Sequence, residues 1–186
     1  KVATPDDVRT RLLPLFQMAG ISAGEVHRAA VASVVPSLTI SWSHAIEKVW
    51  GVKPVCCSAQ VAHECGLFDA DYPSPHEIGS DRVADAIAAR ALYGEPVVVV
   101  DFGTATNIEV VDARGRFVGG VIAPGIMTGA NALFAGAAQV AATGVALPGN
   151  VIGKSTAEAV QSGVVFGEVG RVDGLLARIF DELGGA

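Results

Sequence analysis

Residues 97–106 read Val-Val-Val-Val-Asp-Phe-Gly-Thr-Ala-Thr. Four consecutive valines predict a buried strand of an α/β sheet. We expect this strand to end in the carboxylate of Asp101, with Gly103, Thr104 and Thr106 directly after it. A carboxylate can hold a cation, while backbone N–H groups beside a glycine and side-chain hydroxyls can surround a phosphate. The pattern is typical of a nucleotide-phosphate site; the alternative is an ordinary turn in which Asp101 and Thr104 only cap backbone groups.

Strands and helices alternate before this stretch. Thr4-Pro5-Asp6-Asp7 combines an N-cap, a proline at the first helical position and acids in the first turn, which predicts a helix over 5–18. Pro14 predicts either a kink within that helix or its division into two parts. Periodicity and turn residues further predict a buried strand at 29–35, a short strand at 52–57, helices at 38–50 and 80–93, and a loop at 58–75.

A meander and two helices are expected from residue 96 onward. The predicted strands are 96–100, 107–111 and 117–122, and the last two are joined by a turn at 112–115. Helices are predicted at 125–140 and from Ser155 onward, the second broken near Gly163 or Gly167. This order of elements is typical of the α/β class. The change of composition at Gly94-Glu95-Pro96 predicts a boundary between residues 1–94 and 95–186.

Composition restricts the partners. The chain has 186 residues, 51% of them hydrophobic, and a net charge of −6. It therefore has no basic excess for nucleic acid, so small molecules or other protein chains are the expected partners. No apolar run approaches the roughly 18–20 residues that cross a bilayer, and Lys1-Val2-Ala3 lacks the apolar core of a signal peptide. We expect a cytoplasmic protein without a membrane partner.

The cysteines and histidines give weaker signals. Cys56, Cys57 and Cys65 are odd in number and two are adjacent, which does not favour a disulfide framework. A metal site that combines them with His63 matches no C-x-x-C spacing, so ordinary strand-end and loop thiols are the preferred interpretation. His76 lies three residues before Gly79, where a histidine could border a substrate, but a surface loop residue is the preferred interpretation.

Three ordered motifs between residues 75 and 176 resemble those of type III pantothenate kinases, which belong to the actin-like ATPase and sugar-kinase superfamily. Residues 101–106, a hairpin and the Gly-Gly-Val-Ile-Ala-Pro-Gly of 119–125 resemble the second phosphate motif and the adenosine loop. Gly-Ser-Asp-Arg at 79–82 resembles the family's Gly-Ala-Asp-Arg, and Ile-Gly-Lys-Ser-Thr at 152–156 resembles Ile-Gly-Lys-Asn-Thr. The resemblance implies two ribonuclease-H-like halves with mixed sheets flanked by helices, here residues 1–94, without the first strands, and 95–186, with dimerisation helices.

The resemblance also implies roles for particular residues. Asp81 would be the general base that accepts the proton of the primary hydroxyl of pantothenate as this attacks the γ-phosphate of ATP. Gly79, Ser80, Asp81 and Arg82 would contact pantothenate, with Arg82 supplying positive charge for the anion, and Thr156 would reach it from the partner subunit of a homodimer. An acid and a solvated arginine at a helix start are the alternative for residues 81 and 82.

The nucleotide and its cations are also implied. Gly103, Thr104 and Thr106 would contact ATP, which such enzymes use with Mg²⁺. Asp101 would hold a monovalent cation, K⁺ or NH₄⁺. The implied reaction gives 4′-phosphopantothenate, the first step of coenzyme A biosynthesis.

The chain departs from the family in several places. The family's first phosphate loop, Asp-x-Gly-Asn-Thr, and its C-terminal Thr-Gly-Gly strand have no counterpart, so we expect a segment before Lys1 and no kinase competence without it. A catalytically silent binding or regulatory relative therefore stays open, as does another small alcohol as acceptor. Ser80 and Asn107 replace alanine and threonine, which are mild changes.

A Walker A loop is the competing interpretation of residues 149–155. Gly149 and Gly153 have three residues between them where the motif requires four, and no apolar strand precedes them. We therefore interpret Lys154 as a helix-start residue.

Overall fold

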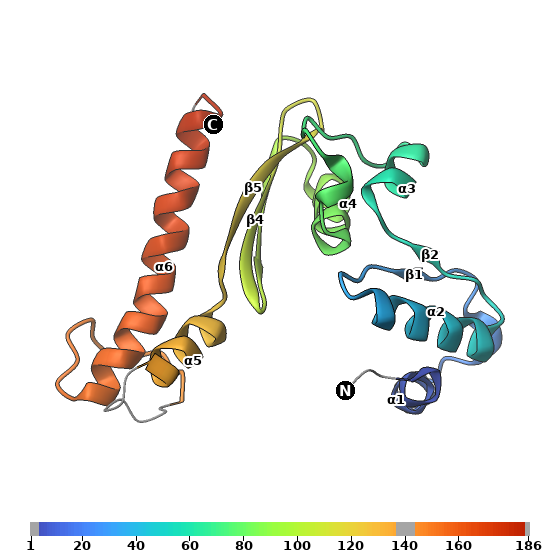
Figure 1. Cartoon of the computed structure of the whole chain (residues 1–186), viewed down its shortest axis with the longest axis horizontal. Helices are drawn as coiled ribbons and strands as arrows, with labels where there is room; N and C mark the ends of the chain where they lie inside the picture. The colour runs from blue at the N-terminus through green and yellow to red at the C-terminus, as the bar shows by residue number, and fades with distance from the viewer. Residues whose placement is uncertain (1–3, 137–143, 185–186) are drawn as a thin grey trace. The chain divides into compact units, whose positions relative to one another are not determined.

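The computed structural model describes residues 4–136 and 144–184. It has mixed α/β structure with helices flanking sheets (Figure 1). Two compact units divide the chain: unit 1 comprises Lys1–Val97 and Glu109–Gly119, and unit 2 comprises Val98–Ile108 and Gly120–Ala186. The predicted α/β class is confirmed.

Unit 1 begins with two packed helices. Helix α1 is Pro5–Met18, as predicted, and Thr4 and Asp7 form a capping box at its start. Pro14 does not divide it. Helix α2, Pro36–Trp50, begins two residues earlier than predicted because Pro36 takes the first helical position. The two helices are in contact, and the rings of Phe16 and Trp50 lie 4.6 Å apart.

The strands that follow these helices are shorter than predicted. β1 is Ala30–Val31 and β2 is Val55–Cys56, and they pair in parallel. The prediction of a buried strand over 29–35 was wrong: Ala30 is exposed, and the Ser33 hydroxyl accepts a hydrogen bond from the Val35 N–H at 3.2 Å, which turns the chain toward α2. Within the part of the chain that the structure describes, β1 and β2 pair only with each other.

The segment predicted as a loop contains a helix. α3, Ala59–Glu64, is capped by the Ser58 hydroxyl, which accepts from the Val61 N–H at 3.2 Å. Ala59 and Ala62 are buried. α3 is too short to show a helical periodicity in the sequence. 3-10 turns occur at Ala23–Glu25 and Pro75–Glu77.

Helix α4, Ser80–Tyr93, has the predicted bounds and carries the core of unit 1. It ends at Gly94, whose φ of +82° is a conformation that glycine tolerates best. Val83 and Ala86 on α4 pack with α3 and with the ends of two strands. The cluster contains Ala59, Ala62, Phe68, Ile78, Val83, Ala86, Val111 and Phe117.

Three strands form one hydrogen-bonded sheet in the order β3-β4-β5. β3 is Val97–Phe102, β4 is Ala105–Val111 and β5 is Phe117–Pro124. Connections as short as 103–104 and 112–116 only permit antiparallel pairing. Each strand is longer than predicted. β3 continues for one residue beyond Asp101, and Thr106 lies within β4 rather than in the loop after a strand.

The predicted hairpin turn is present between β4 and β5. The Asp112 carboxylate accepts from the backbone N–H groups of Arg114 and Arg116, each at 2.9 Å, and from Arg116 Nη2 at 2.8 Å. Gly115 has φ of +74°, and a Cβ there would lie 2.9 Å from Arg90 Nη2. The turn therefore requires both the acid and the glycine.

Unit 2 continues with two helices. α5 is Ile126–Gly136, and the rest of its predicted span, up to residue 140, lies outside the described residues. α6, Thr156–Glu182, begins at the N-cap Ser155 and runs through Gly163 and Gly167 (Figure 1). The predicted break was wrong: the cost of roughly 1 kcal/mol per helical glycine is outweighed by contacts that bury α6 side chains on both sides of these glycines. In the described residues, no helix combines the length and apolarity that a bilayer crossing requires.

Replacing Asp112 by Asn is expected to destabilise the hairpin in a pH-dependent way. Burial raises the pKa of the Asp112 carboxyl, but hydrogen bonds from Arg116 and Arg114 and the charge of Arg116 outweigh this and leave the pKa below its ordinary value. The stabilisation is thus complete above the unfolded-state pKa and is lost as pH falls through the lower, folded-state pKa. Urea midpoints should differ between wild type and Asp112→Asn at pH 7, and the difference should begin to shrink only as the pH falls below about 4. A constant difference across this range would contradict the assignment.

Candidate active site

Gly79, Ser80, Asp81 and Arg82 form the start of α4 in unit 1. Gly79 is the N-cap, and the Asp81 Oδ1 accepts a hydrogen bond from the Arg82 N–H at 2.9 Å. A Cβ on Gly79 would lie 2.5 Å from that same oxygen. The Asp81 carboxylate therefore lies over Gly79, and only glycine leaves it this position. Asp81 is half-buried in the first turn of α4, and a carboxylate is a chemical group that can serve as a general base.

Arg82 does not extend into solvent. Its Nε donates to Glu109 Oε1 at 3.0 Å, and its guanidinium lies 5.2 Å from the centre of the Phe117 ring. The Arg82 side chain is 11% exposed and that of Glu109 is 0% exposed. The solvated arginine that sequence reasoning kept as an alternative is absent: Arg82 is part of a buried ion pair.

Ser80, the first residue of α4, is buried. Among the described residues its hydroxyl has no hydrogen-bond partner. The family's alanine would avoid an unpaired polar atom at this position, so the serine is a departure with a physical cost.

In unit 2, the turn between β3 and β4 is fixed by the beginning of α5. The Thr104 carbonyl oxygen accepts from the Gly125 N–H at 3.0 Å and from the Thr128 hydroxyl at 2.6 Å. A Cβ on Gly125 would overlap the carbonyl oxygen of Gly103. Gly125 therefore allows close contact with a turn that leaves Gly103 and Thr104 exposed to a ligand.

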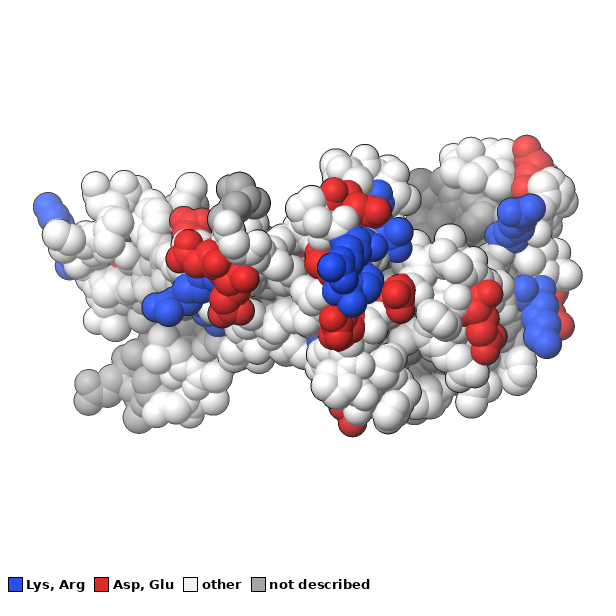
Figure 2. Space-filling view, turned by 90° about the horizontal axis from the view of Figure 1, so that it is seen from above, with Lys and Arg blue, Asp and Glu red and all other residues white. Residues whose placement is uncertain are grey.

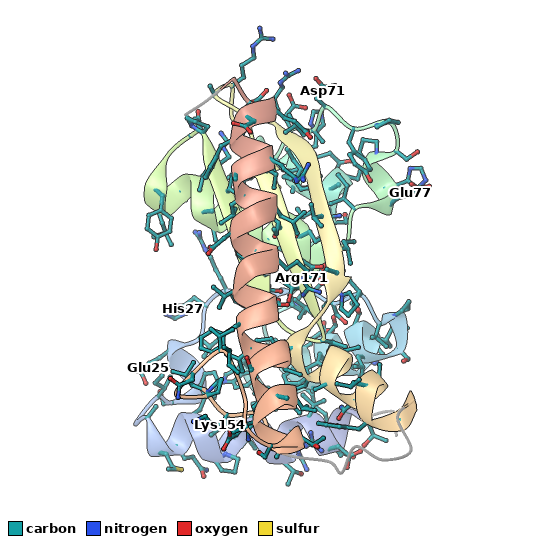
Figure 3. All side chains as sticks on the ribbon, turned by 90° about the vertical axis from the view of Figure 1, so that its left-hand side faces the viewer. Glu25, His27, Asp71, Glu77, Lys154 and Arg171 are labelled. Carbon is teal, nitrogen blue, oxygen red and sulfur yellow. The ribbon has the colours of Figure 1, made fainter. Side chains whose placement is uncertain are left out.

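Thr106 faces away from solvent. It is 2% exposed, and its hydroxyl donates to Glu168 Oε1 on α6 at 2.6 Å. The other oxygen of Glu168 forms an ion pair with Arg171, whose Nη2 also donates to the Pro124 carbonyl at 2.7 Å. Figure 3 shows Arg171 on α6 beside the ribbon of β5. This buried network connects β4, the end of β5 and α6 within unit 2.

Asp101 and Asn107 lie on the same two strands. Asp101 is half-buried in β3, and a Cβ on Gly103 would lie 3.9 Å from its Oδ2, so its carboxylate borders the exposed turn. Asn107 is buried in β4, and within residues 4–136 and 144–184 its Oδ1 has no hydrogen-bond partner. One carboxylate beside an exposed turn can serve as a cation ligand together with water and phosphate oxygens.

Thr156 occupies the first turn of α6 and is exposed. With Ile126, Leu133, Val160 and Val164 it lines a largely apolar groove of about 470 Å³ between α5 and α6. Lys154 precedes the helix near the same end (Figure 3), and its N–H donates to Glu158 at 2.7 Å. This confirms Lys154 as a helix-start residue.

The predicted site residues are divided between the units. The structure brings residues 79–82 together in unit 1, and Asp101, Gly103, Thr104 and Thr156 lie in unit 2. Their roles stay predictions. Sequence reasoning missed Glu109 and Glu168, although an acid within the apolar run Ile108-Glu109-Val110-Val111 is itself a signal, because such a charge must be paired when it is buried.

The other candidate groups gain no support. Cys56 and Cys65 are exposed and Cys57 is half-buried, all three as free thiols. In the described part of the chain, no three His, Cys, Asp or Glu side chains are grouped as for a metal ion. Basic and acidic side chains intermix on the face shown in Figure 2.

Comparison with known proteins decides the family. The family model "Type III pantothenate kinase" matches residues 1–178. A "Type III pantothenate kinase" from Thermomicrobium roseum is 43% identical over 180 residues, which are 97% of this chain and 68% of that protein. One from Agathobacter rectalis is 36% identical over 181 residues, with the same two coverages. The chain belongs to the type III pantothenate kinase family.

Membership confirms the resemblance drawn from the three motifs. A solved chain from Campylobacter jejuni, titled a "conserved putative Baf family transcriptional activator", matches at 23% identity over 67% of this chain and 63% of that chain, with a TM-score of 0.44. That likeness is too weak to bear on the fold of this type III pantothenate kinase relative.

Replacing Thr106 by Val is expected to destabilise the protein by about 1–3 kcal/mol, because it keeps the side-chain shape but removes a buried donor from Glu168. Thr128→Val is the matched control: it removes a hydroxyl from an exposed threonine and should cost less than about 1 kcal/mol. Urea denaturation of both variants measures the difference. Equal effects would show that the buried network does not stabilise unit 2.

Proposed function

We propose that this protein phosphorylates pantothenate with ATP to give 4′-phosphopantothenate, the first step of coenzyme A biosynthesis. The observation that carries the proposal is the family match along 97% of the chain, to relatives whose name states this activity. A catalytically silent relative is not favoured, because the acid at position 81 and the glycine it requires are both present. The cytoplasm is the expected location, since the reaction consumes ATP.

Asp81 is the proposed general base. Its carboxylate is half-buried at the N-terminus of α4 and is oriented by the Arg82 N–H. A base so held can accept the proton of the primary hydroxyl of pantothenate while that oxygen attacks the γ-phosphate. Gly79, Ser80 and Arg82 surround the same substrate in this proposal, and the cation at Arg82 suits its carboxylate.

Gly103 and Thr104 are the proposed ATP contacts. The turn they form is exposed and is fixed by Gly125 and Thr128. The Gly103 N–H already donates to the Ala105 carbonyl at 2.9 Å, so the hydroxyl and N–H of Thr104 are the groups proposed to meet phosphate oxygens. Thr106 is also predicted to contact ATP. Because its hydroxyl donates to Glu168, we propose instead that Thr106 stabilises the turn at Gly103 and Thr104 from within β4.

Cations complete the nucleotide site in this proposal. Asp101 would hold the monovalent cation, K⁺ or NH₄⁺, beside the turn, and Mg²⁺ would accompany ATP mainly through water and phosphate oxygens. Bound there, they would neutralise negative charge on the phosphates. The carboxylate chemistry of Asp101 and its position next to Gly103 fit this use.

The finer architecture is proposed from the family. The two ribonuclease-H-like halves would be residues 1–94 and 95–186, and the second would carry the dimerisation helices α5 and α6. The apolar groove between these helices and the exposed Thr156 at its margin support an interface here.

Transfer of labelled phosphate from ATP tests the proposed reaction, with the protein expressed from its complete reading frame and with pantothenate, sugars and glycerol as acceptors. Pantothenate should be the preferred acceptor. Asp81→Asn should lower turnover by about 10²-fold or more and keep the fold, because it removes the base at nearly constant size. Preference for a different alcohol would refute the substrate, and unchanged turnover would remove Asp81 from catalysis.

A homodimer is the expected assembly, with Thr156 completing the partner's pocket. Sedimentation equilibrium at micromolar concentration should give twice the monomer mass, and Thr156→Val should raise the KM for pantothenate while the dimer persists. A monomer that turns over at the normal rate would contradict both the dimer and the role of Thr156 in trans.

A further inference from the structure

Glu109 is the most deeply buried carboxylate next to a proposed substrate residue. It lies in β4, is 0% exposed and accepts from Arg82 Nε at 3.0 Å. The two residues are 27 positions apart, so the contact exists only in the folded unit 1. Arg82 itself keeps 11% of its side chain exposed. The pair thus joins a fully enclosed acid to a cation with limited access to solvent.

Aromatic rings pack against the guanidinium of Arg82. It lies 5.2 Å from the centre of the Phe117 ring, within the range of a cation–π contact. Phe117 is held in turn by Phe68 and Tyr72, whose ring centroids are 5.8 and 5.9 Å from its own. The Phe117 ring therefore limits the position of the Arg82 guanidinium, and the hydrogen bond from Nε to Glu109 limits its rotation.

Stability alone does not explain this acid. Taking both charges out of water costs about as much as their attraction returns, and a well-packed apolar pair often stabilises a core as well or better. Glu109 interrupts an otherwise apolar strand segment, Ile108 to Val111. An oriented arginine is what the ion pair provides and an apolar residue cannot.

Resting on the proposed function, we propose that Glu109 is a positioning residue that holds Arg82 for the carboxylate of pantothenate. A guanidinium bonded through Nε still has two terminal nitrogens, Nη1 and Nη2, and their planar arrangement matches a carboxylate. Without Glu109 the arginine becomes an unpaired, largely buried cation and rotates toward solvent. Arg82 then keeps its positive charge, but its guanidinium is no longer oriented toward the substrate carboxylate.

The test compares pantothenate with its primary carboxamide, in which the carboxylate is replaced by an uncharged amide. Glu109→Leu fills the site without an acceptor, whereas Glu109→Gln keeps an oxygen for Arg82 Nε. Glu109→Leu should raise the KM for pantothenate roughly tenfold and change the KM values of ATP and the carboxamide by less than about twofold. Glu109→Gln should restore most of the affinity for pantothenate.

Asp112→Asn is the matched control, because it breaks another arginine–carboxylate pair of unit 1, at the hairpin. It should leave every KM unchanged. Equal KM increases for pantothenate and carboxamide in Glu109→Leu, or a loss confined to kcat, would overturn the proposal. Loss of folded protein in both Glu109 variants, by circular dichroism, would also overturn it, because the pair would then be a requirement of the fold.

Calorimetric binding separates this proposal from the proposed reaction. Wild type that binds pantothenate more tightly than the carboxamide but transfers no phosphate would refute the kinase activity and leave the role of Glu109 intact. Wild type that transfers phosphate, with Glu109→Leu binding both compounds as wild type does, would refute only the role of Glu109.

Discussion

Burial of the Glu109 carboxylate is the constraint on which the arrangement of unit 1 depends. A charge with 0% exposure requires a partner, and Arg82 supplies it at 3.0 Å. This contact connects the first turn of α4 to β4, while Phe117 under the guanidinium connects both to the aromatic cluster. Asp81, adjacent to Arg82 in the chain, takes its direction from the same helix start. Asp81, the proposed base, and Arg82, the proposed contact for the substrate carboxylate, are thus both positioned by the start of α4.

Unit 2 also contains a buried carboxylate that is paired with partners from other elements. Glu168 is buried and receives the Thr106 hydroxyl and the Arg171 guanidinium, so α6 is connected to β4 and to the end of β5. Above this network, the turn at Gly103 and Thr104 stays exposed and is fixed through Gly125. In both units, residues that are proposed to bind a ligand are adjacent in the chain to residues that form buried polar contacts. Such contacts limit the motion of the proposed ligand-binding residues before substrate binds.

Local signals predicted the elements that depend on local physics. The capping box at Thr4, the glycine at position 94 and the acid of the hairpin turn each fix a boundary within a few residues, and the structure confirms them. Two predictions failed for different reasons. The strand after residue 29 ends early because of a local contact, the hydrogen bond from the Val35 N–H to the Ser33 hydroxyl. α6 continues past Gly163 and Gly167, and Glu168 beyond them is buried with Thr106 of β4, a residue 62 positions away. The Glu109 and Glu168 contacts span 27 and 62 positions, so a local pattern can mark Glu109 as an acid in an apolar run but cannot identify the partner of either acid.

The central proposal is that residues 79–82 bind pantothenate and that Gly103 and Thr104 bind ATP. A crystal structure of the protein from its complete reading frame, with pantothenate and a non-hydrolysable ATP analogue, tests this most directly. The account predicts the Asp81 carboxylate within hydrogen-bonding distance of the primary hydroxyl of pantothenate, and the phosphates of the analogue at Gly103 and Thr104. Pantothenate bound away from residues 79–82, or phosphates bound away from that turn, would contradict it.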